Sequence, residues 1–167
     1  MIVTIFGGGK APKEIYDLAY ELGKKIGAKG YTLKNGGTDG TMEASAKGCV
    51  EMGGKAIGAV VVNSGDKNLE MQNNCSTEIL KFQTYRDRVA ELMKTDRVIV
   101  LPGQLGTLDE MFVALVTAVV EQLPPVILLG EKNKKLLQYL KENNFLREEH
   151  MPFIEFCESI EDIDFLK

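Results

Sequence analysis

Short runs of apolar residues alternate with longer amphipathic segments along the whole chain. The runs at 2–6 and 98–101 are apolar at nearly every position, which is typical of strands that are covered on both faces. Between such runs, apolar residues recur at helical spacing, as at Ile15, Leu22 and Ile26. We therefore predict strands at 2–6, 31–34, 56–62, 79–82, 98–101, 126–129 and 153–156, helices at 12–26, 41–52, 85–94, 107–122 and 133–143, and a short last helix after Ser159.

This alternation predicts one α/β domain over residues 1–167, with a mainly parallel sheet and helices on both faces. Ligands of such sheets bind beyond the carboxyl ends of the strands. Three glycine clusters, which begin at Gly7, Gly36 and Gly103, follow predicted strands. We expect the three clusters to meet at one edge of the sheet.

The third cluster joins a predicted strand to a predicted helix that carries two carboxylates near its start. Pro102 ends the strand, and Thr107 is predicted to cap the helix. A glycine turn at a helix N-terminus presents free N–H groups and a partial positive charge, which suit an anion such as phosphate. A capped turn without a ligand would have the same local sequence.

The helix predicted at 107–122 is apolar nearly all the way round, as Phe112, Val116 and Val120 illustrate. One sheet covers only one side of a helix, so we predict that the other side forms a subunit interface in a homodimer. The polar segment at 63–76 is longer than most connections and is predicted to be a flap near the site.

Composition narrows the classes of partner. The net charge is −4 with basic residues spread along the chain, so neither nucleic acid nor a membrane is predicted as a partner. The three cysteines form no CxxC pair, and the first apolar run is too short for a signal peptide, which favours reduced thiols and a cytoplasmic location. No metal is predicted, because the only histidine, His150, has no partner at ligand spacing. No cofactor is predicted either, since no lysine has the context of a pyridoxal Schiff base.

The common nucleotide motifs GxxxxGK[ST] and GxGxxG are absent. Two other glycine motifs are present in altered form, as NGGTDGTM at 35–42 and PGQLGTLDE at 102–110. In this order and spacing they resemble GGGxxGxM and PGGxGTxxE of the LOG family, the cytokinin-activating phosphoribohydrolases that are also labelled lysine decarboxylase-like. The resemblance extends over most of the chain, from the first predicted strand to the last.

The resemblance implies a dimer with a modified Rossmann fold that binds a nucleoside 5′-monophosphate, such as AMP or a cytokinin nucleotide. The family cleaves the N-glycosidic bond to give free base and ribose 5-phosphate. Carried over by position, the substrate- and phosphate-binding residues are Gly36, Gly37, Gly40, Thr41, Gly103, Gln104, Gly106 and Thr107. Glu110 matches the catalytic glutamate, and Arg88 matches the essential arginine, with Arg86 as second choice.

The chemistry of the reaction is consistent with these roles. Cleavage passes through an oxocarbenium-like state, which a carboxylate such as Glu110 can stabilise while it orients water. A guanidinium such as that of Arg88 can stabilise negative charge on the leaving base. The structural alternatives are a charged first turn for Glu110 and a solvated helix face for Arg88.

Three positions depart from the family pattern. Gln104 replaces the second glycine of PGG, Val89 replaces the lysine after the arginine, and Asn35 replaces the first glycine of the other loop. The main alternative is therefore a nucleotide- or cofactor-binding protein without hydrolase activity, such as a molybdenum-cofactor carrier protein. The sequence does not determine which base is bound.

Overall fold

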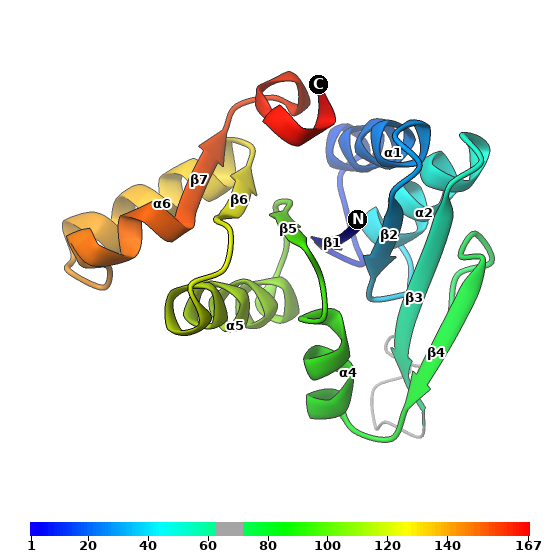
Figure 1. Cartoon of the computed structure of the whole chain (residues 1–167), viewed down its shortest axis with the longest axis horizontal. Coiled ribbons are helices and arrows are strands. Elements are labelled where there is room, and N and C mark those ends of the chain that lie inside the picture. Colours follow the sequence, from blue (N-terminus) through cyan, green and yellow to red (C-terminus); the bar gives the residue numbers. More distant parts are fainter. Residues whose placement is uncertain (63–71) are drawn as a thin grey trace.

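The computed structural model describes residues 1–62 and 72–167. Its centre is a sheet of seven strands, all parallel, in the order β4-β3-β2-β1-β5-β6-β7 (Figure 1). The strands are β1 (Ile2–Phe6), β2 (Thr32–Asn35), β3 (Lys55–Val61), β4 (Glu78–Phe82), β5 (Arg97–Val100), β6 (Val126–Leu129) and β7 (Ile154–Cys157). The helices are α1 (Lys13–Ala28), α2 (Thr41–Glu51), α4 (Tyr85–Leu92), α5 (Leu105–Glu121) and α6 (Glu131–Glu142), with 3-10 helices η1 (Glu148–Phe153), η2 (Ile160–Asp162) and η3 (Asp164–Leu166).

The strand order places a switch in connection direction beside β1. The chain runs outward from β1 through β2 and β3 to β4, and it then returns to add β5 on the other side of β1. Ile5 of β1 is in register with Ile99 of β5, and Val3 is in register with Leu33 of β2. The loops that follow β1 and β5 therefore lie side by side, which is where open parallel sheets bind ligands.

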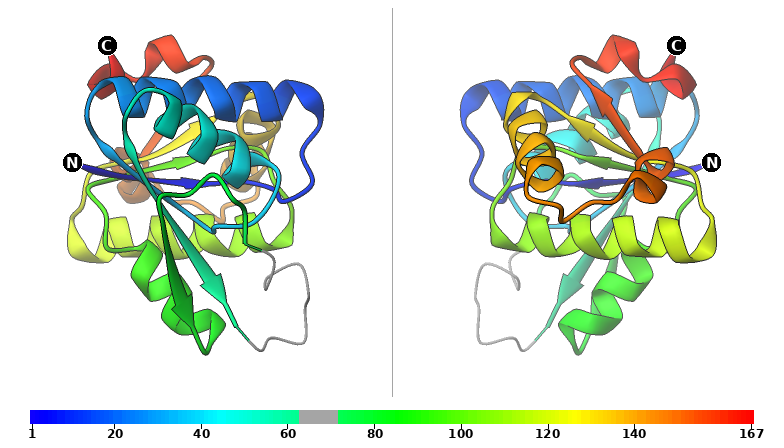
Figure 2. Two further views of the ribbon diagram at one scale, coloured as in Figure 1. Left: turned by 90° about the vertical axis from the view of Figure 1, so that its right-hand side faces the viewer. Right: turned by 90° about the vertical axis from the view of Figure 1, so that its left-hand side faces the viewer.

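Helices cover both faces of the sheet, as predicted (Figure 2). On one face, Leu22 and Ile26 of α1 join a core cluster with residues of α2 and of the C-terminal 3-10 helices. On the other face, Met111 and Leu115 of α5 pack with Leu92 of α4 and with α6. The α/β fold with a parallel sheet is thus confirmed, because β-strands with continuous apolar runs are buried between two helical layers.

The central helix begins earlier than predicted. Helix α5 starts at Leu105 and its N-cap is Gln104, not Thr107, and the Gln104 side chain makes no capping hydrogen bond. Thr107 is buried, and a Cβ built on Gly103 would lie 2.1 Å from its Oγ1, so its side chain packs against the glycine turn. Thr107 therefore lies in the first turn of α5 and packs against Gly103 of the preceding turn.

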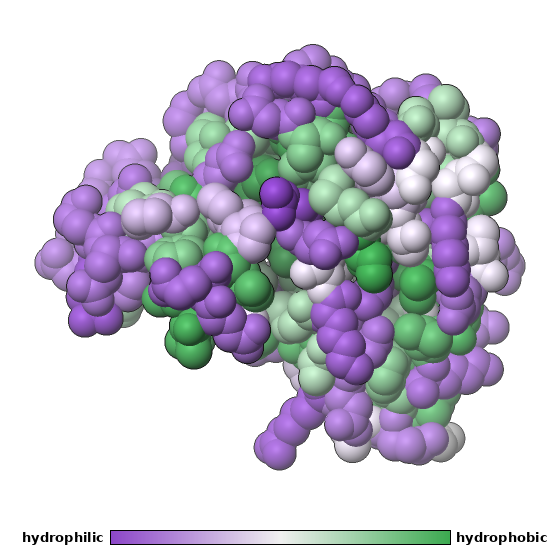
Figure 3. All heavy atoms as spheres, viewed as in Figure 1, coloured by the Kyte–Doolittle hydropathy of each residue, from purple (hydrophilic) through white to green (hydrophobic). Residues whose placement is uncertain are grey.

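The exposed face of α5 carries apolar side chains, whereas Met111, Ala114 and Ala118 of the same helix are buried. Val116 is 62% exposed and Val120 is 73% exposed, one turn apart. Figure 3 shows hydrophobic residues at the surface in the region that α5 occupies in Figure 1. No helix in the described part of the chain is long and apolar enough to span a membrane.

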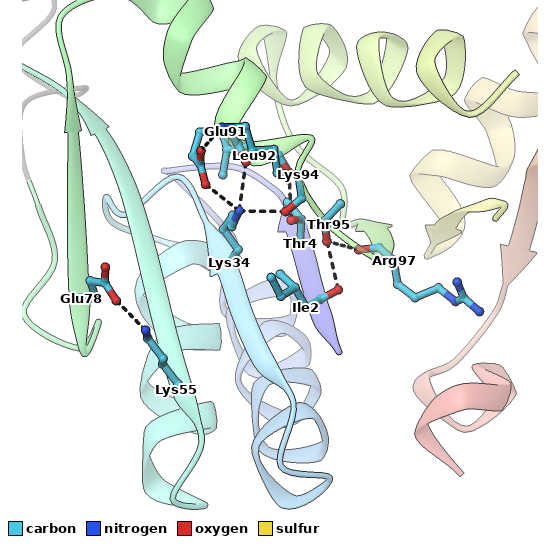
Figure 4. A network of polar contacts seen from close by, with 10 residues as sticks. All are labelled: Ile2, Thr4, Lys34, Lys55, Glu78, Glu91, Leu92, Lys94, Thr95 and Arg97. Carbon is cyan, nitrogen blue, oxygen red and sulfur yellow. Dashed lines mark hydrogen bonds and ion pairs between the residues drawn. The ribbon is translucent and has the colours of Figure 1, made fainter. Parts of the chain in front are cut away.

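A buried lysine on β2 fixes the end of α4. The Nζ of Lys34 donates to the carbonyl oxygens of Glu91 and Lys94 and to the Glu91 carboxylate, at distances of 2.9–3.0 Å (Figure 4). Nearby, the Thr4 hydroxyl donates to the Leu92 carbonyl at 3.1 Å. A cation at a helix C-terminus satisfies carbonyls that have no partner within the helix. These bonds hold α4 against β1 and β2, and α4 carries the arginine described below.

Candidate functional site

The loops after β1 and β2 are joined to each other. The Thr41 amide and hydroxyl both donate to the Gly8 carbonyl, at 3.1 and 3.2 Å. A Cβ built on Gly7 would lie 2.4 Å from Thr41 Oγ1, and one built on Gly40 would lie 2.5 Å from the Gly8 oxygen. Thr41 is fully buried, so its hydroxyl holds the two loops together. Glycine is needed here because the backbones approach too closely for a side chain.

Two buried asparagines support the Gly36–Gly37 loop. Asn35 accepts a hydrogen bond from the Gly37 amide at 2.9 Å and donates to the Met42 carbonyl at 2.8 Å. The Asn73 amide donates to the Gly37 carbonyl at 2.8 Å, and its side chain donates to the Thr38 carbonyl at 2.9 Å. Gly37 has a φ of 71°, which favours glycine. Asn35, a departure from the family motif, therefore lies beneath the loop and braces it.

The N-terminus of α5 has free backbone donors. Its first helical bond runs from the Leu108 amide to the Gln104 carbonyl at 3.0 Å. The amides of Leu105, Gly106 and Thr107 precede this bond and have no partner among residues 1–62 and 72–167. A Cβ built on Gly106 would meet nothing within 4 Å, so the approach to these amides is open. Such a helix end suits an anion.

Arg88 and Glu110 form a buried ion pair next to this helix end. Arg88 Nη1 lies 2.8 Å from Glu110 Oε1, and the two side chains are 4% and 8% exposed. Arg88 Nε also donates to the Ala59 carbonyl at 2.7 Å. The pair thus joins α4, the first turns of α5 and the end of β3. The structure brings Arg88 against Glu110, whereas Arg86 is exposed to solvent.

The Nη2 nitrogen of Arg88 lies next to the glycine loop after β2. A Cβ built on Gly36 would lie 2.1 Å from Arg88 Nη2, so a side chain at that position would displace the guanidinium. Nη2 has no hydrogen-bond partner among the residues that the structure describes. This nitrogen therefore lies against the β2 loop, at the junction of that loop with α4 and α5.

Burial governs the electrostatics of the pair. Desolvation raises the pKa of the Glu110 carboxyl, and the neighbouring Arg88 guanidinium opposes this rise. A second contact runs parallel to the pair, since the Tyr85 hydroxyl donates to Asp109 Oδ2 at 2.8 Å. Burial and this hydrogen bond raise the pKa of Tyr85, which stays a neutral donor, and its ring centroid lies 5.8 Å from the Arg88 guanidinium carbon. Two polar contacts, Arg88–Glu110 and Tyr85–Asp109, thus link α4 to the first turns of α5.

The structure places the candidate residues in three groups. Gly103, Gln104, Gly106 and Thr107 form the β5–α5 turn, and Gly36, Gly37, Gly40 and Thr41 form or support the β2–α2 turn. Glu110 and Arg88 lie between these turns. Sequence reasoning missed Asn73 and Lys34, because their partners are remote in sequence. Asn73 lies within the flap predicted at 63–76, of which residues 63–71 lie outside the described part.

The fold and the site together define a Rossmann-like α/β protein with glycine-rich turns and a candidate anion site at the switch between β1 and β5. A model of the SLOG cluster4 family matches residues 1–152, and the chain belongs to this family. An uncharacterized protein of Archaeoglobus fulgidus is 32% identical over 133 residues, which cover 78% of this chain and 85% of that protein.

Two further comparisons concern proteins with a described role. A cytokinin riboside 5′-monophosphate phosphoribohydrolase of Mycobacterium tuberculosis is 36% identical over 104 residues, 59% of this chain and 53% of the enzyme. The alignment thus spans about half the length of that relative. The molybdenum cofactor binding protein of Rippkaea orientalis superposes with a TM-score of 0.76 at 25% identity, over 99% of this chain and 93% of that chain. The predicted LOG-like family is confirmed.

Proposed function

We propose that the protein hydrolyses the N-glycosidic bond of a nucleoside 5′-monophosphate to free base and ribose 5-phosphate. The observation that carries the proposal is the buried Arg88–Glu110 pair beside the uncapped N-terminus of α5. An anion site and a carboxylate–guanidinium pair in one place are what this reaction needs. The likeness to the mycobacterial phosphoribohydrolase supports the same substrate class.

In the proposed complex, the 5′-phosphate binds to the free amides of Leu105, Gly106 and Thr107. The partial positive charge of the helix end adds to these hydrogen bonds. The phosphate thereby anchors the ribose near the next turn of the same helix, which carries Glu110. Binding energy from the phosphate then serves to position the sugar for reaction.

The proposed reaction adds water to C1′. The oxygen of water bonds to C1′ while the C1′–N bond breaks, and the base leaves with the electron pair of that bond. A proton from water ends on the base nitrogen. Ionised Glu110 stabilises the oxocarbenium-like sugar and orients the water, and Arg88 Nη2 stabilises negative charge on the base.

The burial of the pair fits these roles. Electrostatic interactions are stronger where water is excluded. The Arg88 guanidinium and the Glu110 carboxylate already hold each other in place, so neither group needs to reorganise during the reaction. Arg88 is held at two further points, by the Ala59 carbonyl and by its contact with the Tyr85 ring. Its position is thus set before a substrate binds.

The experiment is a panel of nucleoside monophosphates incubated with the purified protein, with free base and ribose 5-phosphate both measured. Glu110→Gln is the matched control, since it keeps the shape of the side chain and removes its charge. Release of base that depends on Glu110 supports the proposal and identifies the preferred base. No release from any member of the panel would overturn it.

A second candidate function is the binding of a nucleotide or cofactor without hydrolysis. The observation that favours it is the full-length likeness to the Rippkaea orientalis cofactor-binding protein, together with Gln104 at the turn where the LOG motif has glycine. In the panel, this function predicts tight binding without release of base. Gln104→Gly would then be the first variant to test for a gain of hydrolysis.

We also propose that the protein is a homodimer through the exposed face of α5. Phe112, Val116 and Val120 recur at helical spacing on that face and are 41%, 62% and 73% exposed. A stripe of this kind is costly to leave in water. A second copy of the same helix offers a matching surface, since two-fold interfaces are self-complementary.

A further inference from the structure

Two residues beside the ion pair, Tyr85 and Asp109, have no part in the proposed reaction. Tyr85 lies on α4 three residues before Arg88, and Asp109 lies on α5 immediately before Glu110. The Tyr85 hydroxyl donates to Asp109 Oδ2 at 2.8 Å, so this contact joins the same two helices as the ion pair. Asp109 is exposed and Glu110 is buried, which places the Tyr85–Asp109 contact on the solvent side of the pair.

The Tyr85 ring supports one face of the Arg88 guanidinium. The guanidinium carbon lies over the ring at 5.8 Å from its centroid, which is a cation–π geometry. The edge of the guanidinium is held by Glu110 Oε1 at 2.8 Å and by the Ala59 carbonyl at 2.7 Å. Guanidinium N–H bonds lie in the plane of the group, so these two contacts do not cover its face. The ring thus restricts a tilt that the two hydrogen bonds leave free.

Asp109 fixes the far end of the Tyr85 side chain. The near end is already held, because Tyr85 follows the N-cap of α4, Thr84, whose hydroxyl accepts from the Asp87 amide at 3.1 Å. Burial and the hydrogen bond to Asp109 raise the pKa of Tyr85 above its ordinary value of 10.0, so the hydroxyl keeps its proton and its role as donor at neutral pH. The ring is therefore anchored at both ends.

We propose that Asp109 is a positioning residue that acts through Tyr85. Its carboxylate holds the Tyr85 hydroxyl, the Tyr85 ring holds the face of the guanidinium, and the guanidinium stays against Glu110. The inference rests on the proposed function only for its effect on turnover. Its effect on the Glu110 carboxyl is the same whether or not the protein is a hydrolase.

The charge of Asp109 has a second, direct effect on Glu110. Burial raises the pKa of the Glu110 carboxyl, Arg88 lowers it, and the negative charge of Asp109 raises it. As the anchor of Tyr85, Asp109 keeps Arg88 close and so lowers the pKa of Glu110. As a neighbouring charge it raises the same pKa. Substitutions that remove one effect at a time can separate the two.

The test is an NMR titration of the Glu110 side-chain carboxyl carbon, with Glu110→Gln used to assign its resonance. Tyr85→Phe keeps the ring and removes the anchoring hydrogen bond, and we expect it to raise the pKa of Glu110 by about half a pH unit or more, because Arg88 is held less closely. Asp109→Asn keeps an acceptor for the Tyr85 hydroxyl and removes the charge, so it should lower the pKa of Glu110.

The double variant Tyr85→Phe/Asp109→Asn shows which effect causes the rise. Compared with Asp109→Asn alone, it should still raise the pKa of Glu110, because no charge at position 109 remains to account for the change. The matched control is Tyr139→Phe, since Tyr139 is 57% exposed on α6 and stacks on Phe145. This control should leave the Glu110 titration unchanged.

Turnover gives a second measurement on the same variants. If AMP is hydrolysed, Tyr85→Phe should lower kcat about tenfold and change KM by less than about twofold, since it displaces the reacting groups and leaves the proposed phosphate site intact. Tyr139→Phe should change neither kcat nor KM.

An unchanged pKa of Glu110 in Tyr85→Phe would overturn the proposal, because the contact would then only join the two helices. A rise that disappears in the Asp109→Asn background would also overturn it, since charge alone would explain the rise. A rise that persists there, without release of base from any nucleotide, would support the positioning role and overturn the proposed reaction. Release of base from AMP with an unchanged Glu110 titration in Tyr85→Phe would do the reverse.

Discussion

Breaking the Arg88–Glu110 pair from one side should destabilise the protein strongly at neutral pH. In Arg88→Met, Glu110 keeps a buried carboxyl whose side chain is only 8% exposed and loses its cationic partner. Removal of one partner of a buried pair typically costs about 3–5 kcal/mol. The carboxyl can avoid an unpaired charge by binding a proton, which sets an upper limit on the electrostatic part of the cost.

That limit follows from the ordinary pKa of the carboxyl, 4.5. Protonation of such a group at pH 7 costs about 3.4 kcal/mol, at about 1.36 kcal/mol per pH unit. At pH 5 the same protonation costs only about 0.7 kcal/mol. In the variant, the pKa of Glu110 is higher in the folded than in the unfolded protein. The stability of the variant is therefore retained below the unfolded pKa and falls as pH rises from the unfolded pKa to the folded pKa.

The assay is urea denaturation of wild type and Arg88→Met at pH 5 and pH 7, with circular dichroism as the probe of folding. We expect the deficit of the variant to be smaller at pH 5 than at pH 7, by no more than about 2.7 kcal/mol, because the pKa of Glu110 is also raised in wild type. The double variant Arg88→Met/Glu110→Gln should recover most of the deficit at pH 7, because no buried charge remains. A deficit that is independent of pH, or a double variant no more stable than the single one, would refute the reasoning.

Three further predictions concern the phosphate site, the interface and the support of α4. Gly106→Ala should change the free energy of unfolding by less than about 1 kcal/mol in calorimetric melting, because the added Cβ meets open space. The same variant should bind AMP at least tenfold more weakly, and unchanged AMP binding would contradict a phosphate site at the N-terminus of α5. Val116→Lys, at a position that is 62% exposed, should give a monomer in sedimentation equilibrium while the wild type is a dimer, and a monomeric wild type would contradict the interface. Lys34→Met should lower the free energy of unfolding by about 1–3 kcal/mol, because the Glu91 and Lys94 carbonyls lose their donor. Amide hydrogen exchange should speed up more in α4 than in α1, and an equal increase in both helices would contradict a specific role of Lys34 in holding α4.

The order of strands and helices could be predicted from the sequence because buried parallel strands are continuous apolar runs. The runs at β1 and β5 made these strands recognisable, and glycine after each one marked the sheet edge. The start of α5 could not be predicted well. Thr107 is a good N-cap by type, but its side chain is required against Gly103, and the helix begins at Leu105 with no side-chain cap.

The candidate site was only partly predictable for a related reason. Local motifs indicated Glu110 and the two glycine turns, and the resemblance to the family's arginine motif, with Tyr85 and Leu92 at its flanking apolar positions, favoured Arg88 over Arg86. The contacts of Arg88 with the Ala59 carbonyl and with Gly36 depend on how β3, α4 and the β2 loop come together, which no local pattern encodes. The same holds for Asn73, whose partners are in the loop after β2.

The electrostatic account also predicts the pH dependence of turnover. In the proposed reaction Glu110 acts as a carboxylate, so kcat/KM should fall as pH falls through the pKa of Glu110 in the free protein. Burial raises that pKa above the ordinary value of 4.5, so the acid limb should lie at a higher pH than for an exposed glutamate. Weakening the guanidinium contact with Arg88→Lys should move the limb further up, because Arg88 opposes the rise.

The most direct test of the central proposal measures AMP binding and adenine release on the same preparations of wild type and Glu110→Gln. We expect both proteins to bind AMP with affinities within about fivefold, since the proposed phosphate contacts are the amides of Leu105, Gly106 and Thr107 and not the Glu110 side chain. Adenine and ribose 5-phosphate should appear together in equal amounts with wild type, and their release should fall at least about 100-fold in the variant. AMP bound by wild type without release of adenine, or equal release by both proteins, would contradict it.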